Sequence, residues 1–418
     1  MKPIFPVMCC SAILFSSCVS VVRHSNIPPP DAPQEVRTGI DNLVSSDFQL
    51  IAEKRVALLV NSASRAADLR PTFGIFQQTS RCRLVAVFTP EHGYDAAATA
   101  GAAVKNDTID GAPFFSLYGK FRRPTREMLA SCDVVVADIQ DVGIRSYTFV
   151  STLRNVMDAC AEFGKEIVVL DRPNPLGGLL IDGAPADTSS LSFVAALPVP
   201  YLHGCTVGEL AAMMNGENWL PSKRKARLTV VPMTGWKRSM TWENTGLRWM
   251  PTSPNVPTPE TIRSMAMTGL LGEAGGVSIG IGTALPFRYI GRPDSLAEQV
   301  LTLTRQARLP CDAVQVRFKP QFGAFQQQLC AGVMLFPAAR QERYFSAGIA
   351  ILAALRPALP AIAEQARKHD SMLQKVLANP VLCRALAEGQ PSDVILKLAA
   401  DREEQFRQLR DKYLLYKE

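Results

Sequence analysis

The sequence lacks the short motifs that bind nucleotides and the spacings that bind metals. It has no G-x-G-x-x-G after its first strand-like segment and no G-x-x-x-x-G-K-[ST], so a dinucleotide-dependent enzyme is disfavoured and we expect no cofactor. Its ten cysteines contain no C-x-x-C pair, and its four histidines are far apart in the chain, so we expect no metal. The absence of G-x-S-x-G argues against a serine hydrolase.

The sequence also lacks a basic run with interleaved aromatic residues. Its net charge of +7 is spread over 418 residues, which indicates a mildly basic surface and no nucleic-acid partner. With 47% hydrophobic and 20% charged residues, the composition is that of a globular protein. Seven cysteines follow the N-terminal region; most are expected to be small buried side chains.

The N-terminus resembles a bacterial export signal. Lys2 precedes an apolar stretch over residues 4–15, and Ser16-Ser17-Cys18 follows. This pattern predicts a lipoprotein-type signal peptide over 1–18 with Cys18 as the lipidated residue, although Phe15 stands where leucine is usual. Residues 19–37, with three consecutive prolines, would then be a tether. We therefore expect an exported chain that is periplasmic or held at the membrane by this anchor. The alternative is a hydrophobic N-terminal helix that packs.

Strand-like and helix-like segments alternate in the first half of the chain. Apolar runs rich in β-branched residues predict strands over residues 55–61, 83–88, 134–139 and 167–170. Helical patterns lie between them, over residues 125–131 and 151–163. This alternation predicts an α/β fold with a Rossmann-like, doubly wound, mostly parallel sheet.

The second half changes character after a proline-rich loop over 251–259. We place a domain boundary near residue 260: a catalytic domain over 38–260 and a smaller α+β domain over 261–418 that closes a cleft. Strands are expected over 313–318 and 332–336, and a charged helix over 401–415.

Polar side chains follow four of the predicted strands, where open α/β sheets bind ligands. Glu91, in the turn Thr89-Pro90-Glu91-His92-Gly93, is the candidate general acid, since a carboxyl group at a rigid turn beside an apolar strand is suited to proton donation. The alternative is that Glu91 caps the next helix. His92 and His203 are candidate sugar contacts, or else structural histidines.

The next two strand ends supply further candidates. Asp138 and Asp141 could provide a second carboxylate, and Arg145 and Tyr147 an anion anchor and a stacking surface. Alternatively, the acids and the arginine simply pair with each other. Further candidates for substrate binding are Gln140, Arg172, Asn174 and Asn255.

With these motifs laid out, the chain resembles the exo-β-N-acetylmuramidase NamZ family, formerly the bacterial domain of unknown function DUF1343. The matching stretches are TPEHG (89–93), SLYGK (116–120), DIQDVGIRSYT (138–148), DRPNPLGG (171–178), LHGCTVGELA (202–211), GWKR (235–238) and SPNVPTP (253–259). The resemblance implies a Rossmann-like domain joined to a smaller one, with the active site between them. It also implies a glycoside hydrolase that releases terminal β-linked N-acetylmuramic acid (MurNAc) from peptidoglycan fragments in cell-wall turnover or recycling.

Carried onto this sequence, the family's E-H-G glutamate falls on Glu91, the best candidate for the catalytic acid. Asp138, Asp141 or the substrate's own 2-acetamido oxygen would then stabilise C1 of the sugar.

The chain departs from the family in three places. One loop reads Ser278-Ile279-Gly280-Ile281-Gly282-Thr283 where the family often has S-E-G-R-G-T, so two charged positions are apolar. The N-P-T-G turn after the first strand reads Asn61-Ser62-Ala63-Ser64, and a histidine-containing segment of the C-terminal part reads Phe336-Pro337-Ala338-Ala339. These departures leave an alternative open: a binding or scaffolding lipoprotein for muropeptides that has lost activity. The oligomeric state is not predicted.

Overall fold

The computed structural model describes residues 35–102 and 106–417. The signal peptide, Cys18 and most of the tether lie outside the described residues. The end of the tether is described: Val36 is buried and Arg37 bridges to Thr234.

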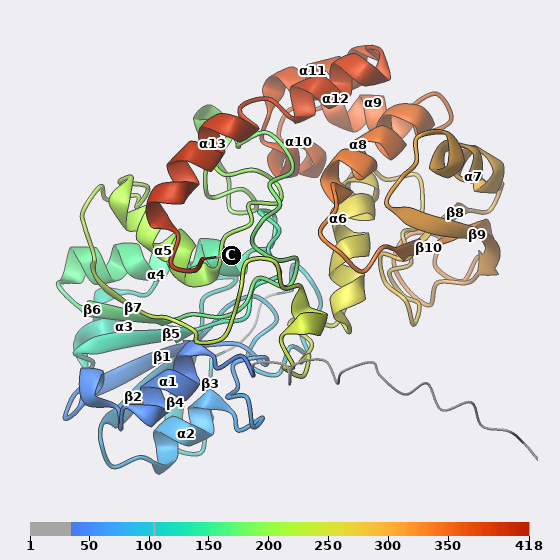
Figure 1. Cartoon of the computed structure of the whole chain (residues 1–418). Coiled ribbons are helices and arrows are strands. Elements are labelled where there is room, and N and C mark those ends of the chain that lie inside the picture. Colours follow the sequence, from blue (N-terminus) through green and yellow to red (C-terminus); the bar gives the residue numbers. More distant parts are fainter. Residues whose placement is uncertain (1–34, 103–105, 418) are drawn as a thin grey trace, which may run out of the picture. The chain divides into compact units, whose positions relative to one another are not determined.

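The first domain is built on a seven-stranded sheet in the order β3-β4-β2-β1-β5-β6-β7 (Figure 1). Its strands are β1 (Arg55–Val60), β2 (Arg83–Thr89), β3 (Asp107–Ile109), β4 (Ala112–Ser116), β5 (Val134–Asp138), β6 (Glu166–Leu170) and β7 (Arg227–Val231). All neighbouring pairs are parallel except β3 with β4 at one edge. The predicted mostly parallel sheet is confirmed, and the four strands predicted from the sequence are β1, β2, β5 and β6.

Alternate residues of the central strand β1 enter two different cores. Val56 and Leu58 pack in a cluster that contains Phe76, while Ala57 and Leu59 belong to the cluster of Leu153. Because successive side chains of a strand point to opposite faces, both faces of the sheet are covered. The helices of this domain are α1 (Gly39–Ser45), α2 (Thr72–Gln78), α3 (Arg126–Ala130), α4 (Phe149–Phe163) and α5 (Val207–Gly216), with 3-10 turns η1 (Gln49–Ile51), η2 (Thr188–Ser190) and η3 (Trp242–Asn244).

The second domain combines a three-stranded antiparallel sheet with a helical layer. Its elements are α6 (Pro259–Ala274), β8 (Tyr289–Arg292), α7 (Ala297–Gln306), β9 (Cys311–Phe318), β10 (Cys330–Pro337), α8 (Tyr344–Leu355), α9 (Pro360–Arg367), α10 (Met372–Leu377), α11 (Pro380–Glu388), α12 (Ser392–Ala399), α13 (Glu403–Arg410) and η4 (Asp411–Tyr413). Strands β9 and β10 confirm the two predicted there; the short β8 was not predicted. The structure thus confirms the predicted α+β fold of the smaller domain.

The C-terminal tail returns to the first domain. The Tyr416 hydroxyl donates to Asp171 Oδ2 at 2.5 Å, and the backbone N–H of Leu415 donates to Glu209 Oε1 at 3.0 Å. Tyr416 also packs against Trp236. These contacts tie the end of the chain to the turn after β6.

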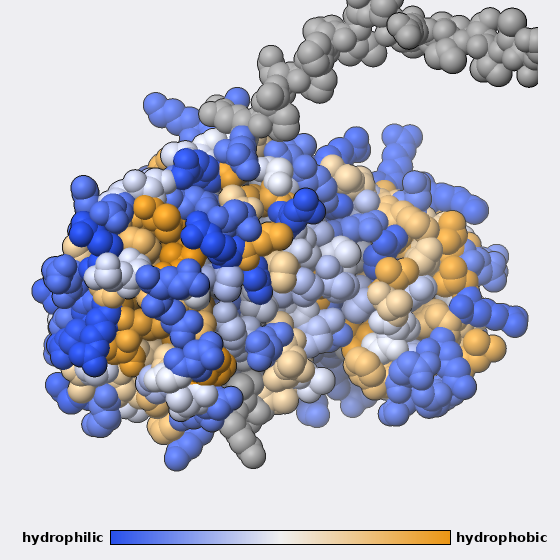
Figure 2. Space-filling model, turned by 90° about the horizontal axis from the view of Figure 1, so that it is seen from below, coloured by the Kyte–Doolittle hydropathy of each residue, from blue (hydrophilic) through white to orange (hydrophobic). Residues whose placement is uncertain are grey.

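The described cysteines are all free and buried, as expected of small apolar side chains, and burial raises the pKa of Cys311 to about 12. Within the described ranges, no single helix is long and apolar enough to cross a membrane; α8 and α9 pass that test only as a pair, bent by 112°. On the face shown in Figure 2, apolar residues lie in small groups among hydrophilic ones.

Candidate active site

The turn that follows β2 places a carboxyl group at the carboxyl edge of the sheet. Its backbone is tight: His92 and Gly93 both have positive φ, +73° and +75°, and the Gly93 N–H donates to the Pro90 carbonyl at 3.2 Å. A left-handed conformation is uncommon for a residue other than glycine, though histidine adopts it more readily than most. Glu91 is only 7% exposed, so the turn holds a carboxyl group inside the protein.

Two groups fix the orientation of the Glu91 carboxyl. The Gly101 N–H donates to Oε1 at 2.8 Å, and the Thr148 hydroxyl donates to Oε2 at 2.6 Å. Tyr118 lines the same cavity, and burial, together with the nearby charge of Glu91, raises its pKa. A carboxyl group held from two sides in this way is pre-positioned for chemistry.

Glu91 lines a cavity of about 350 Å³ whose walls come from both domains. One wall belongs to the loops at the strand ends and includes Glu91, His92, Tyr118 and residues 146–148. The facing residues from the second domain are Met265, Gly269 and Glu273 of α6, Phe287, and Met372 and Val376 of α10. A cavity of this volume is typical of small-ligand sites.

Four residues predicted from the sequence meet at this cavity: Glu91, His92, Tyr147 and Asn255. His92 Nδ1 lies 2.7 Å from the Ala98 carbonyl oxygen. Because a carbonyl only accepts, Nδ1 carries the hydrogen, and Nε2 of the neutral ring is left as an acceptor for a hydroxyl. The Tyr147 hydroxyl donates to Thr252 at 2.7 Å, and burial raises its pKa.

Comparison with known proteins agrees with this geometry. A family model described as the N-terminal part of the exo-beta-N-acetylmuramidase NamZ matches residues 56–260, and the model of the C-terminal part matches residues 264–416. The chain belongs to the NamZ family. It is therefore a member of a family of glycoside hydrolases, and its cavity lies between the parts that the two family models cover.

Three NamZ-family relatives resemble the chain over nearly all of its length. The peptidoglycan beta-N-acetylmuramidase NamZ of Bacillus subtilis (strain 168) is 35% identical over 386 residues, 91% of this chain and 92% of that protein. Two crystal structures of DUF1343 proteins from Bacteroides fragilis NCTC 9343 superpose with TM-scores of 0.85 and 0.72, at 34% and 28% identity. Each covers 92% of this chain, and this chain covers 100% and 99% of theirs. These likenesses give no support to a lapsed binding protein.

Asp138 and Arg172, predicted as second carboxylate and substrate anchor, are engaged with each other instead. Arg172 Nε donates to Asp138 Oδ1 at 2.5 Å and Nη2 donates to Oδ2 at 2.8 Å. The Thr72 hydroxyl also bonds Asp138, and Arg172 Nη2 donates to the Arg65 carbonyl. Asp138 is fully buried. The two residues therefore correct the sequence-based assignment: they join strand ends and do not line the Glu91 cavity.

Asp141 is likewise turned into the protein. Its Oδ2 accepts the Gly143 N–H at 2.8 Å, while Oδ1 is buried without a hydrogen-bond partner among the described residues. Burial raises the pKa of Asp141 to about 7. Because it is not among the cavity-lining residues, it is not placed to act on a substrate there.

Arg145, which was predicted to bind a substrate anion, instead binds the protein backbone. Its guanidinium donates to four backbone carbonyls: Nη1 to Ala184 and Val199, Nη2 to Val376 and Leu377, at 2.8–3.1 Å. Burial lowers its pKa to about 10. Arg145 thus fastens α10, one wall of the cavity, to the first domain.

The remaining predicted residues bond within the protein. Gln140 Nε2 donates to the carbonyls of Asp141 and Pro173, while its Oε1 is buried without a partner among the described residues. Asn174 Nδ2 donates to the Cys205 carbonyl, and its Oδ1 accepts from Leu176. His203 Nδ1 accepts the Cys205 N–H at 3.1 Å, and burial, with the nearby charges of Arg410 and Arg145, lowers its pKa to about 3. His203 is therefore a neutral structural histidine.

Sequence reasoning missed three residues at or beside the cavity. Tyr118 lies within the SLYGK motif, which was its only signal. Arg122 stacks over the rings of Tyr118 and Phe193, with its guanidinium carbon 5.7 and 4.4 Å from their centroids. Glu273 ends an otherwise apolar stretch of α6, and no local pattern marks it.

The loop that departs from the NamZ pattern does not line the Glu91 cavity. Ser278 pairs with Gly291 through two backbone hydrogen bonds. Ile279 is buried, and its side chain fills the space beside Gly272. The apolar residue at position 279 therefore contributes to the core of the second domain.

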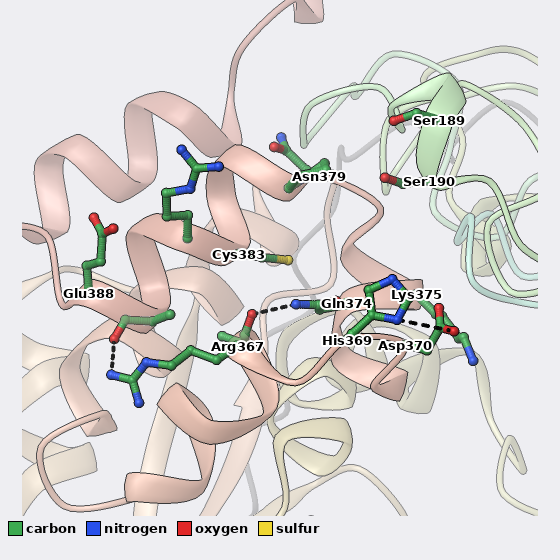
Figure 3. A pocket seen from close by; sticks show the side chains of 14 residues that line it. Ser189, Ser190, Arg367, His369, Asp370, Gln374, Lys375, Asn379, Cys383 and Glu388 are labelled. Carbon is green, nitrogen blue, oxygen red and sulfur yellow. Dashed lines mark hydrogen bonds and ion pairs between the residues drawn. The ribbon is translucent and has the colours of Figure 1, made fainter.

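A second cavity, of about 580 Å³, lies among α9, α10, α11 and η2 (Figure 3). Its charged lining residues are of both signs: Arg367, Lys375 and Arg384 with Asp370 and Glu388. Arg367 donates to the Ala387 carbonyl at 2.8 Å. None of the residues predicted for the site lines this cavity. Elsewhere in the described ranges, no three His, Cys, Asp or Glu side chains group as metal ligands.

Proposed function

We propose that the chain is an exo-acting β-N-acetylmuramidase that releases terminal β-linked MurNAc from the non-reducing ends of peptidoglycan fragments. The observation that carries this proposal is the Glu91 carboxyl, fixed by two hydrogen bonds at the wall of a cavity of about 350 Å³. The B. subtilis relative, named for this class of reaction, supports it.

Glu91 protonates the glycosidic oxygen as the bond from C1 of the terminal sugar breaks through an oxocarbenium-like state. His92 Nε2 accepts a sugar hydroxyl, and Asn255 provides an amide at the same cavity. The apolar residues Met265 and Val376 lie on the opposite wall. A cavity whose walls come from both domains suits binding of the terminal sugar of a glycan.

Arg122 is the residue we assign to the lactyl carboxylate that distinguishes MurNAc from other amino sugars. Its guanidinium makes no hydrogen bond to the described part of the protein. Arg122 is exposed and does not itself line the Glu91 cavity, but it lies over Tyr118, which does, so it is placed to reach a substituent that projects from the cavity. Arginine's planar fork binds carboxylates through two parallel hydrogen bonds. Arg145 and Arg172 are both occupied within the protein.

Incubation with a MurNAc-GlcNAc disaccharide tests the proposal. We expect equimolar free MurNAc and GlcNAc by mass spectrometry, and no cleavage of GlcNAc-MurNAc, in which MurNAc is not at the non-reducing end. Cleavage of both disaccharides, or of neither, would contradict an exo-acting muramidase.

We also propose that the chain is exported and lipidated at Cys18. The support is the sequence Lys2, the apolar stretch 4–15, and Ser16-Ser17-Cys18. Expression in a bacterium fed labelled palmitate should give a labelled, membrane-associated protein, and Cys18→Ser should abolish the label. Label on the Cys18→Ser chain would refute lipidation at that residue.

A further inference from the structure

Helix α6 presents one stripe of side chains to the Glu91 cavity. Met265, Gly269 and Glu273 are spaced four residues apart and all line it. Residues four apart lie on the same face of a helix, so these three follow one line along α6. The other side of the helix is packed in the core, with Met267 and Leu271 fully buried. Glu273 therefore belongs to the cavity by helix geometry.

Glu273 makes neither a hydrogen bond nor an ion pair with the described residues, whereas Glu91 accepts hydrogen bonds from Gly101 and Thr148. Its side chain is exposed, and its neighbours in the cavity include Met265 and Phe287. The apolar neighbours raise the pKa of Glu273 above its usual value by partial desolvation. Glu273 is therefore a carboxylate that faces the cavity, is open to water and is not engaged by the protein around it.

Two carboxylates thus line one cavity from different domains: Glu91 from the loop after β2 and Glu273 from α6. We propose that Glu273 is the second catalytic carboxylate, acting as the general base that activates the attacking water. This rests on the proposed function. Most glycoside hydrolases use a pair of carboxyl groups that flank the scissile bond, one as acid and one as base or nucleophile.

Glu91 gives its proton to the glycosidic oxygen as the C1–O bond breaks, and the leaving sugar departs with a hydroxyl. A water oxygen bonds to C1, and Glu273 takes one proton of that water. The terminal sugar then carries a C1 hydroxyl of inverted configuration, and the proton on Glu273 returns to Glu91 through solvent.

Kinetics of Glu273→Gln and Glu273→Ala on 4-nitrophenyl β-MurNAc test the proposal. We expect kcat to fall about 10²- to 10⁴-fold, with an unchanged melting temperature. Added azide should restore turnover of Glu273→Ala and yield the α-azide of MurNAc. The wild-type chain should release α-MurNAc first, as read by NMR. The matched control is Glu298→Gln, an exposed glutamate of α7, which should keep full activity.

Three results would overturn the role of Glu273: kcat within a few-fold of wild type, no rescue by azide, or β-MurNAc as the first product. All three results require a wild-type chain that hydrolyses the substrate. If the wild type itself is inactive, the proposed function is wrong; if the wild type is active and one of these results is obtained, only the role of Glu273 is wrong.

Discussion

Asp138 and Arg172 form a buried two-point ion pair that joins the end of β5 to the turn after β6, with N–O distances of 2.5 and 2.8 Å. Both residues are at most 3% exposed. The pair lies at the carboxyl edge of the sheet, where ligands usually bind. In this protein the ion pair instead stabilises the edge of the sheet beside the Glu91 cavity.

Asp138→Asn should therefore act mainly on stability. It leaves the Arg172 charge buried without its counter-ion, which typically costs about 3–5 kcal/mol. Urea unfolding should show this loss, while the folded fraction keeps a kcat within a few-fold of wild type. A variant of wild-type stability that is inactive would instead place Asp138 in the chemistry.

Removal of the Arg145 guanidinium should loosen the wall formed by α10. Arg145→Met leaves four buried carbonyls without their donors, and each unsatisfied group costs about 1–3 kcal/mol. We expect faster hydrogen exchange at the amides of α10 and a raised KM, since Met372 and Val376 line the cavity. Unchanged exchange in α10 would show that Arg145 does not hold that helix.

The titration of Asp141 should make stability depend on pH. Burial raises its pKa to about 7, while aspartate in an unfolded chain titrates near ~3.9. Between these values the native state keeps a proton that the unfolded chain has lost, so this contribution to the free energy of unfolding is complete below about pH 4 and falls as pH rises through 7.

Comparison of wild type with Asp141→Asn isolates this contribution from that of His203. The pKa of His203 is lowered to about 3, so its own contribution has the opposite sign: stability falls as pH drops below about 6.5. The stability difference between wild type and Asp141→Asn should shift in favour of the variant from pH 4 to pH 7. A difference that is constant with pH would contradict the raised pKa.

Arg122→Gln should impair recognition of the lactyl carboxylate. We expect kcat/KM for 4-nitrophenyl β-MurNAc to fall about 10- to 100-fold, in line with about 1.5–3 kcal/mol for a hydrogen bond to a charged group. The slower hydrolysis of the corresponding GlcNAc glycoside should not change. Arg126→Gln is the matched control, since Arg126 stacks on Phe163. Equal losses on both glycosides would remove Arg122 from lactyl recognition.

The sequence predicted the architecture well because strands buried on both faces leave uninterrupted β-branched runs. It also located Glu91, because a polar turn directly after such a run lies at the sheet edge. It could not separate Glu91 from Asp138, Arg145 and Arg172, since strand-end position does not show whether a polar side chain points into a cavity or bonds the backbone. Glu273 lay beyond local pattern altogether, because tertiary packing alone brings α6 to the cavity.

The central claim is that Glu91 at this cavity cleaves terminal MurNAc. The most direct test compares wild type and Glu91→Gln for MurNAc release from MurNAc-GlcNAc, with both proteins verified as folded. We predict stoichiometric release by the wild type and a rate lower by about 10²- to 10⁴-fold for the variant. A Glu91→Gln enzyme that releases MurNAc within a few-fold of the wild-type rate would contradict the account.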